Sequence, residues 1–225
     1  RSLKMGNYNI MVTGANGETA SAVITSFLNN GYTVIGLSSS SEHNHIKCNQ
    51  YTHIQTDILD IDKLKISFNT IFEQNIQIHG LINIAGGFTM GQNIDGEISK
   101  EWERMYQVNF VSALNCISLV IRHMKDYNFG RIINFGSSVA LEGMASAGPY
   151  IISKACVHAL TKTLAKELDD YDITCNAILP GIIDTLANRT AMPNEDTNDW
   201  VSMNTIFNSI NTILKSNDNG FLITI

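Results

Sequence analysis

The chain carries at residues 9–20 the stretch Asn9-Ile10-Met11-Val12-Thr13-Gly14-Ala15-Asn16-Gly17-Glu18-Thr19-Ala20. An apolar run typical of a buried strand leads here into a turn of the pattern GxxGxx(G/A) and then into a helical pattern. Gly14 permits the tight turn, Gly17 lets the backbone approach a pyrophosphate, and Ala20 lets the helix pack closely on the strand. The free N–H groups of the helix would face the phosphates, although an ordinary strand-to-helix turn stays the alternative. We expect Glu18, which is unfavourable beside a phosphate, to point to solvent.

The rest of the chain alternates short β-branched runs with longer helical patterns, which is typical of βαβ units around a parallel sheet. Strands are expected at residues 9–12, 33–37, 53–56, 81–84, 131–135, 174–179 and 221–225. Helices are expected at residues 18–29, 61–73, 99–125, 150–168 and 205–215. We therefore expect an α/β protein with a Rossmann-like, doubly wound parallel sheet of about seven strands. The layers should be α/β/α, and one domain should span residues 1–225.

Composition limits the classes of function. The 225 residues include 15 Lys and Arg against 21 Asp and Glu, for a formal net charge of −6. This charge gives no general attraction to nucleic acid or to an anionic membrane, so we expect neither partner. The cysteines, Cys48, Cys116, Cys156 and Cys175, lack CxxC or metal-ligand spacing, and no secretory pattern is evident at the N-terminus. We expect a cytoplasmic protein that acts on a small molecule and has no metal site.

The ends of the second and third predicted strands bear on the choice of a dinucleotide. NAD sites of this type usually place an acid at the end of the second strand, where it binds the ribose 2′-hydroxyl and repels a 2′-phosphate. Here Ser38 and Ser39 stand instead, and the glycine turn contains no Arg or Lys. NAD and NADP both stay open, and the missing acid favours NADP. Asp57, after the third strand, is expected either to bind the adenine amino group or to cap its own turn.

Tyr150-Ile151-Ile152-Ser153-Lys154 places a phenol and an ammonium one helical turn apart, since 154 − 150 = 4. A phenol with a pKa of about 10 is a poor proton donor at neutral pH, and a nearby cation lowers that pKa. Ser137 precedes Tyr150 by 150 − 137 = 13 residues and follows the fifth predicted strand, where open α/β sheets bind their ligands. We expect Ser137, in preference to Ser138, to bind a substrate carbonyl while Tyr150 delivers the proton.

Asn109 lies in the apolar helical pattern Val108-Asn109-Phe110, where an amide is unusual unless it is used. It is expected either to bond its own helix or to hold a water molecule that links Lys154 to solvent.

Together these residues resemble the short-chain dehydrogenases/reductases over nearly the whole chain. Thr13-Gly14 with Gly17 is similar to the cofactor turn of that family, and Asn83-Ile84-Ala85-Gly86 to its NNAG motif with Ile for the second Asn. Pro180-Gly181-Ile182-Ile183-Asp184-Thr185 is similar to its PG motif and the following threonine.

The resemblance implies a catalytic tetrad of Asn109, Ser137, Tyr150 and Lys154. It also implies that a set of residues contacts NAD(P): Gly14, Asn16, Gly17, Ser38, Asp57, Ala85, Gly86, Tyr150, Lys154, Pro180, Gly181, Ile183 and Thr185. Homodimers or homotetramers would form through residues 102–124 and 150–168.

The segment from Asp184 to Pro193, followed by Trp200, is similar to the tail of quinonoid dihydropteridine reductases. Those reductases favour NADH and generally lack the tetrad serine and asparagine, so this chain departs from them at both points. We expect residues 181–200 to form a mobile lid over cofactor and substrate, and a rigid packed segment is the alternative.

The sequence therefore predicts an NAD(P)-dependent oxidoreductase that transfers a hydride between a nicotinamide and a carbonyl or imine carbon. A dihydropteridine reductase-like enzyme and a 3-oxoacyl thioester reductase are alternatives for the substrate. A dinucleotide-sensing regulator is the alternative outside enzymes, and the intact Tyr150 and Lys154 pair counts against it.

Overall fold

A parallel sheet of seven strands forms the centre of the structure, a computed structural model that describes residues 8–41, 46–91, 93–95 and 99–225. Its order is β3-β2-β1-β4-β5-β6-β7, and every neighbouring pair is parallel. The strands are β1 Asn9–Thr13, β2 Thr33–Ser38, β3 Tyr51–Gln55, β4 Gly80–Asn83, β5 Gly130–Phe135, β6 Ile173–Leu179 and β7 Leu222–Thr224. The strand order reverses between β1 and β4, which is where such sheets open a crevice for a ligand.

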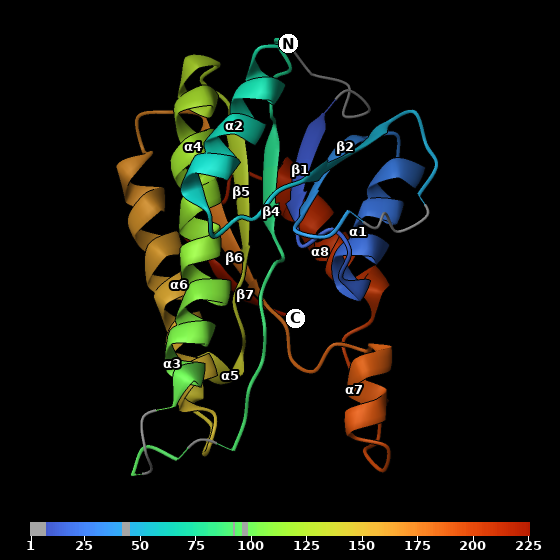
Figure 1. The fold of residues 1–225 in the computed structure, drawn as a ribbon, viewed down its shortest axis with the longest axis vertical. Coiled ribbons are helices and arrows are strands. Elements are labelled where there is room, and N and C mark those ends of the chain that lie inside the picture. Colours follow the sequence, from blue (N-terminus) through green and yellow to red (C-terminus); the bar gives the residue numbers. More distant parts are fainter. Residues whose placement is uncertain (1–7, 42–45, 92, 96–98) are drawn as a thin grey trace.

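Helices cover both faces of the sheet (Figure 1). Helices α1 (Glu18–Asn29) and α8 (Met203–Lys215) pack on one face, where Phe27 and Ile210 are fully buried. Helices α2 (Ile61–Phe72), α4 (Ser112–Asp126) and α6 (Gly148–Glu167) cover the other face through a second apolar cluster that includes Phe68 and Val120. The predicted Rossmann-like α/β fold with three layers is confirmed.

The helix predicted at residues 99–125 is divided. Helix α3 (Lys100–Met105) continues into a π-helical segment, Tyr106–Val111, before α4 begins. A π-helical turn holds one more residue than an α-helical turn, and such turns are frequent at functional sites. Asn109 lies inside this segment, and its amide forms hydrogen bonds with Gly87 and Ser153 from other segments. Because these partners are distant in sequence, the helical period of residues 99–125 did not indicate the interruption.

Two short helices were not predicted, α5 (Val139–Glu142) and α7 (Leu186–Ala191). Each spans fewer than two turns, too short for a helical period to appear in the sequence. Both follow strands at the carboxyl edge of the sheet, at the lower end of Figure 1.

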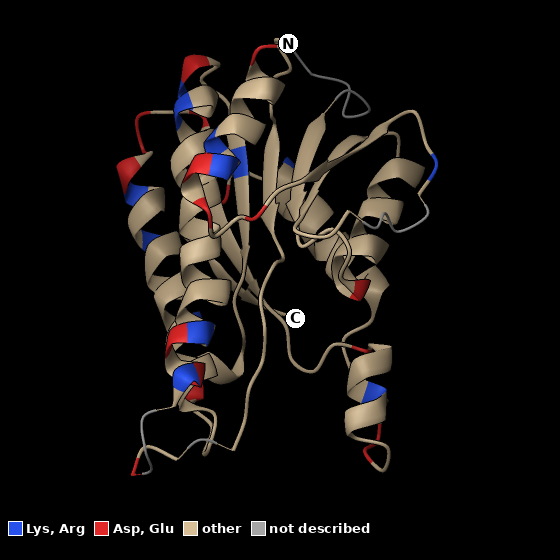
Figure 2. Cartoon of the chain, viewed as in Figure 1, with Lys and Arg blue, Asp and Glu red and all other residues tan. Residues whose placement is uncertain are grey.

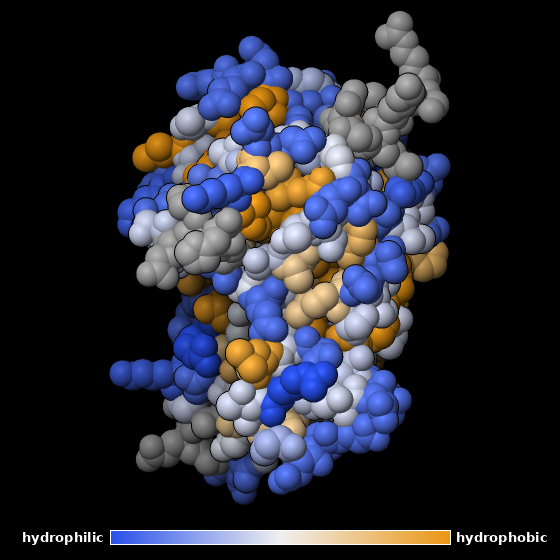
Figure 3. Space-filling model, turned by 90° about the vertical axis from the view of Figure 1, so that its right-hand side faces the viewer, coloured by the Kyte–Doolittle hydropathy of each residue, from blue (hydrophilic) through white to orange (hydrophobic). Residues whose placement is uncertain are grey.

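Charged positions are concentrated on the helices and loops, where acidic and basic positions often lie side by side (Figure 2). On the face seen in Figure 3, apolar patches are separated by polar side chains. Within the described residues, no helix is both long and apolar enough to cross a bilayer, and no group of His, Cys, Asp and Glu is arranged to bind a metal ion.

Candidate active site

A cleft of about 590 Å³ opens at the carboxyl ends of β1, β2 and β4. Eight of the residues predicted to contact a dinucleotide line it: Gly14, Asn16, Gly17, Ser38, Asp57, Ala85, Gly86 and Thr185. The carboxyl edge of the sheet at the reversal of strand order is the expected place for such a ligand.

The glycine turn is built for close approach. Gly14 has a φ of +70°, which favours glycine, and a Cβ added there would lie 3.0 Å from Ala85 Cα. Gly17 is the N-cap of α1 and supplies no side-chain cap. The first-turn residues Glu18 and Thr19 line the cleft, so the start of α1 offers N–H groups and a positive dipole end to an anion.

Two buried oxygen atoms of cleft residues lack hydrogen-bond partners within the described part of the chain, Asn16 Oδ1 and Thr56 Oγ1. Buried polar groups without partners are costly and rare in folded proteins. Both atoms would be satisfied by a polar ligand in the cleft. A nucleotide has hydroxyl and amino groups that could donate to these two oxygen atoms, and phosphates that could lie against the glycine turn.

At the end of β2, the Ser38 hydroxyl lies 2.7 Å from His53 Nε2 and donates to Ser40 O at 3.1 Å. Ser38 is thus already held by His53 of β3 and by the backbone that follows β2, contacts that the sequence did not predict. Asp57 accepts a hydrogen bond from Leu59 N at 3.0 Å, so it caps its own turn, which was one of its two expected roles, while still lining the cleft.

Glu18 is exposed, as expected, but its carboxylate also has a partner on another element. Its two carboxylate oxygens each accept from the Leu186 backbone N–H at 3.0 Å. Leu186 is the first residue of α7, so the carboxylate caps that helix from another part of the chain. The contact joins the glycine turn to the segment after β6.

Next to the cleft, the Ser137 side chain lies close enough to the Tyr150 phenol to lower its pKa by hydrogen bonding. Lys154, on the same face of α6 as Tyr150, lies with Nζ 6.0 Å from the centroid of the Tyr150 ring and donates to Phe135 O at 2.7 Å. Gly86 joins this group to the cleft, because a Cβ added there would lie 3.5 Å from Lys154 Nζ.

The electrostatics of this group differ from the sequence-based expectation that Lys154 lowers the pKa of Tyr150. Burial raises the pKa of Tyr150, and the hydrogen bond from Ser137 opposes that rise. Burial also lowers the pKa of Lys154 to about 8. Desolvation is therefore the main cause of both pKa shifts. It favours the protonated phenol of Tyr150 and destabilises the charged form of Lys154.

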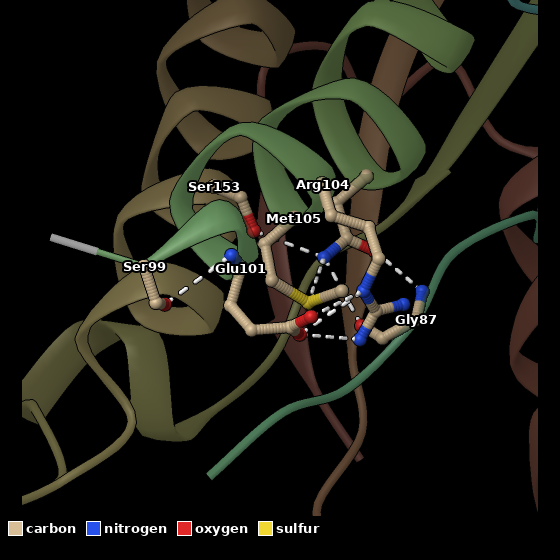
Figure 4. Close-up of polar contacts among 7 residues, drawn as sticks. Gly87, Ser99, Glu101, Arg104, Met105 and Ser153 are labelled. Atoms are coloured by element: carbon tan, nitrogen blue, oxygen red, sulfur yellow. Dashed lines mark hydrogen bonds and ion pairs between the residues drawn. The ribbon is translucent and has the colours of Figure 1, made fainter. Parts of the chain in front are cut away.

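The Asn109 amide contacts Gly87 and Ser153 outside its own helix and Met105 within it; Figure 4 labels these three partners. Its amide nitrogen donates to Gly87 O at 3.0 Å and to Ser153 Oγ at 2.9 Å, and its oxygen accepts from Gly87 N at 2.9 Å. The amide thus fastens the segment after β4 to α6. Asn109 Nδ2 also donates to Met105 Sδ at 3.7 Å, so the expected bond within its own helix is present beside the bonds to other segments. The predicted water link to Lys154 stays a prediction.

The other predicted contacts lie after β6. Pro180 O accepts from Ser138 N at 3.2 Å, and Gly181 N donates to Ile225 O at 3.2 Å. Thr185 caps α7 by accepting from Asn188 N at 3.1 Å, and Ile183 pairs with Val201. Of these residues only Thr185 lines the cleft.

Sequence reasoning missed two contacts of the Ser137–Tyr150 group. The Phe88 ring packs edge-on against Tyr150, with centroids 4.9 Å apart. His158 Nε2 accepts a hydrogen bond from Ser137 N at 3.3 Å. The position of His158 two helical turns after Tyr150 was a signal for the second contact, whereas nothing in the pattern around Phe88 indicated the first.

A family profile matches most of the chain. The profile, described as short chain dehydrogenase, matches residues 8–196. The chain is 29% identical over 182 residues to the short chain dehydrogenase adrF of Penicillium rubens, covering 78% of this chain and 69% of that protein. It is also 29% identical over 180 residues to the 3-oxoacyl-(acyl-carrier-protein) reductase FabG of Vibrio harveyi, covering 78% of this chain and 73% of that protein.

Solved structures share the fold. ElxO with NADP bound superposes with a TM-score of 0.89 at 22% identity, covering 97% of this chain and 96% of that chain. The aldohexose dehydrogenase AldT of Thermoplasma acidophilum superposes with a TM-score of 0.84 at 26% identity, covering 97% of this chain and 92% of that chain.

Proposed function

Because the chain belongs to the short-chain dehydrogenase family and is an NAD(P)-dependent oxidoreductase, we propose that it transfers a hydride to a carbonyl carbon with Tyr150 as the proton donor. The observation that carries this proposal is that Ser137 and Lys154 both lie beside the Tyr150 phenol, next to the dinucleotide cleft. A regulator that only senses a dinucleotide would not require these groups together.

The residues divide into two roles. The glycine turn, Asn16 and Thr56 would bind the dinucleotide, which supplies the hydride when bound. Ser137 would bind and polarise the carbonyl oxygen, and Tyr150 would give that oxygen its proton. Lys154 would bind the nicotinamide ribose, whose hydroxyl oxygens would accept hydrogen bonds from the ammonium. Asn109 would hold the water molecule of the proton path.

The substrate we favour is a carbonyl compound without a negatively charged carrier. Two cations near the carboxyl edge are neutralised, Arg104 by Glu101 at 2.6 Å and Arg189 by Asp184 at 2.6 Å. A reductase of carrier-bound 3-oxoacyl thioesters, the activity named for the Vibrio relative, needs free cations to receive an acidic carrier. That activity and a dihydropteridine reductase-like activity are the alternatives.

A panel of uncharged ketones, an acetoacetyl thioester and a quinonoid pteridine, each with NADPH and NADH, tests the proposal. Oxidation of the cofactor by a ketone that depends on Tyr150 supports it. Absence of turnover on every compound, with tight cofactor binding, supports the regulator instead.

The first prediction concerns cofactor choice. NADPH should bind at least as tightly as NADH, because Ser38 stands where an acid would repel the 2′-phosphate. Ser38→Asp should weaken NADPH relative to NADH by roughly tenfold or more, since like charges would then face each other. Isothermal titration with both cofactors measures this, and a clear NADH preference of the wild type contradicts it.

A second prediction follows from Glu18, which lines the cleft in the first turn of α1 while its carboxylate caps α7. Glu18→Gln should tighten NADPH binding by about two- to fivefold, the effect of one charge at a helix end. It should also speed amide exchange across residues 186–191, because the neutral amide caps α7 less well. Glu73→Gln, at the other end of the sheet, is the control with the same charge change.

If Glu18→Gln binds the cofactor more weakly than Glu73→Gln does, the carboxylate assists binding and this prediction is wrong. The same exchange experiment tests the predicted lid: protection of residues 182–200 that is high without cofactor and unchanged with it indicates a rigid segment.

We propose in addition that residues 1–225 act as one domain, in a cytoplasmic homodimer or homotetramer. The proposed oligomer rests on the family resemblance, which implies that subunits associate through the helices of residues 102–124 and 150–168.

A further inference from the structure

We propose that His158 is a positioning residue that fixes the backbone of Ser137 and so aims the Ser137 hydroxyl at Tyr150. This inference rests on the proposed function and adds a residue to its machinery. Its basis is a ladder of contacts from one face of α6 to the end of β5.

Three polar side chains of α6 hold three successive parts of β5 and its extension. Thr161 Oγ1 accepts from Asn134 Nδ2 at 3.0 Å, and Lys154 Nζ donates to Phe135 O at 2.7 Å. His158 Nε2 accepts from Ser137 N at 3.3 Å. His158 thus acts on the main chain of the residue whose side chain meets Tyr150.

The imidazole of His158 also packs closely against Gly136, the residue before Ser137. A Cβ added at Gly136 would clash with His158 Nε2 and Cδ2. On its other side, Gly136 N donates to Ile178 O of β6 at 2.9 Å. The turn into Ser137 is therefore clamped between the imidazole and β6, and a side chain at Gly136 would push the imidazole away.

The imidazole can accept this hydrogen bond because it stays neutral. Burial lowers the pKa of His158 to about 4, with additional lowering by the charges of Lys154 and Lys162. The Nε2 atom then keeps its lone pair for Ser137 N, and the ring proton is assigned to Nδ1. A protonated ring would lose the acceptor and face Lys154.

His158→Leu removes the acceptor and is the first test. The kcat on the best ketone of the panel should fall roughly tenfold or more, because small displacements of reacting groups are costly, while the NADPH affinity stays within about twofold. His158→Gln places an amide oxygen near the position of Nε2 and should recover most of the loss. In a Ser137→Ala background, His158→Leu should have little further effect, because its influence passes through Ser137.

A substrate-free readout separates positioning from general loss of structure. The phenolate difference titration of wild type against Tyr150→Phe reports the pKa of Tyr150, which the Ser137 hydrogen bond lowers. Among the residues that the structure describes, the polar side chains placed beside that phenol are Ser137 and Lys154. His158→Leu should raise this pKa, and His158→Gln should not.

The matched control is His123→Leu. His123 Nε2 accepts from Ile78 N at the same 3.3 Å, but at the other end of the sheet. It should lower the melting temperature without moving kcat or the Tyr150 pKa. If His158→Leu and His158→Gln leave both quantities at wild-type values while Tyr150→Phe is inactive, the His158 inference is overturned and the proposed function stands. If Tyr150→Phe keeps its activity, the proposed function itself fails.

Discussion

Tyr150→Phe should lower kcat by about 10² to 10⁴, the range that a positioned acid contributes. The ring remains, with its edge-on contact to Phe88, and only the hydroxyl that meets Ser137 is lost. Because the phenol is next to the cleft rather than among its lining residues, the affinity for NADPH should stay within a few-fold. Steady-state kinetics on the best ketone and calorimetry with NADPH measure the two quantities.

Tyr171→Phe is the matched control for this substitution. Tyr171 is partly exposed, and its ring lies under Lys125, a contact that phenylalanine preserves. The control should keep wild-type kcat. Retention of more than about a tenth of wild-type kcat by Tyr150→Phe would remove the phenol from its proposed role, since loss of a positioned acid costs more than that.

Lys154→Met should inactivate the enzyme and stabilise the fold. Burial lowers the pKa of Lys154 from 10.5 to about 8, so at pH 7 its charge destabilises the folded state by about 3 kcal/mol. Losing the hydrogen bond that the ammonium donates to Phe135 O costs about 2 kcal/mol in return. The net gain in the free energy of unfolding should be about 1 kcal/mol, with kcat lower by roughly 10² or more.

The pH dependence of this effect has a defined sign. Between pH 8 and pH 10.5 the folded state has released the Lys154 proton while the unfolded state still binds it. The unfolded state then holds more protons, so the free energy of unfolding of the wild type rises across this window. The advantage of Lys154→Met should therefore shrink as the pH rises from 8 to 10.5.

Denaturant unfolding at several pH values measures this difference. Lys162→Met removes an exposed ammonium from the same helix and should show no comparable change. An advantage of Lys154→Met that is absent at pH 7, or constant up to pH 10.5, would mean that the buried ammonium is compensated within the fold.

The sequence alone determined the architecture, and it pointed to residues that the structure places in or beside the cleft. Alternating patterns located all seven strands, and the glycine turn predicted a cleft at Gly14 and Gly17. The spacing of Tyr150 and Lys154 predicted their common face on α6. These features are local: a turn needs glycine where φ is positive, and helical periodicity brings together residues one turn apart.

Only the tertiary structure decided what those residues meet. Glu18 caps α7 across a separation of 168 residues, and His158 reaches Ser137 from another element. Periodicity reports which side of a helix is apolar, but it does not report which backbone group faces that side. The π-helical turn around Asn109 likewise depends on partners after β4 and on α6.

The pKa shifts of Tyr150 and Lys154 were the property that the sequence predicted least well. Spacing predicted that Lys154 would lower the pKa of Tyr150, whereas burial raises it and also lowers the pKa of Lys154. A charge in water interacts mainly with its near neighbours, but a charge removed from water responds first to its own desolvation. Desolvation depends on every segment that closes over the site, and that arrangement exists only once the chain has folded.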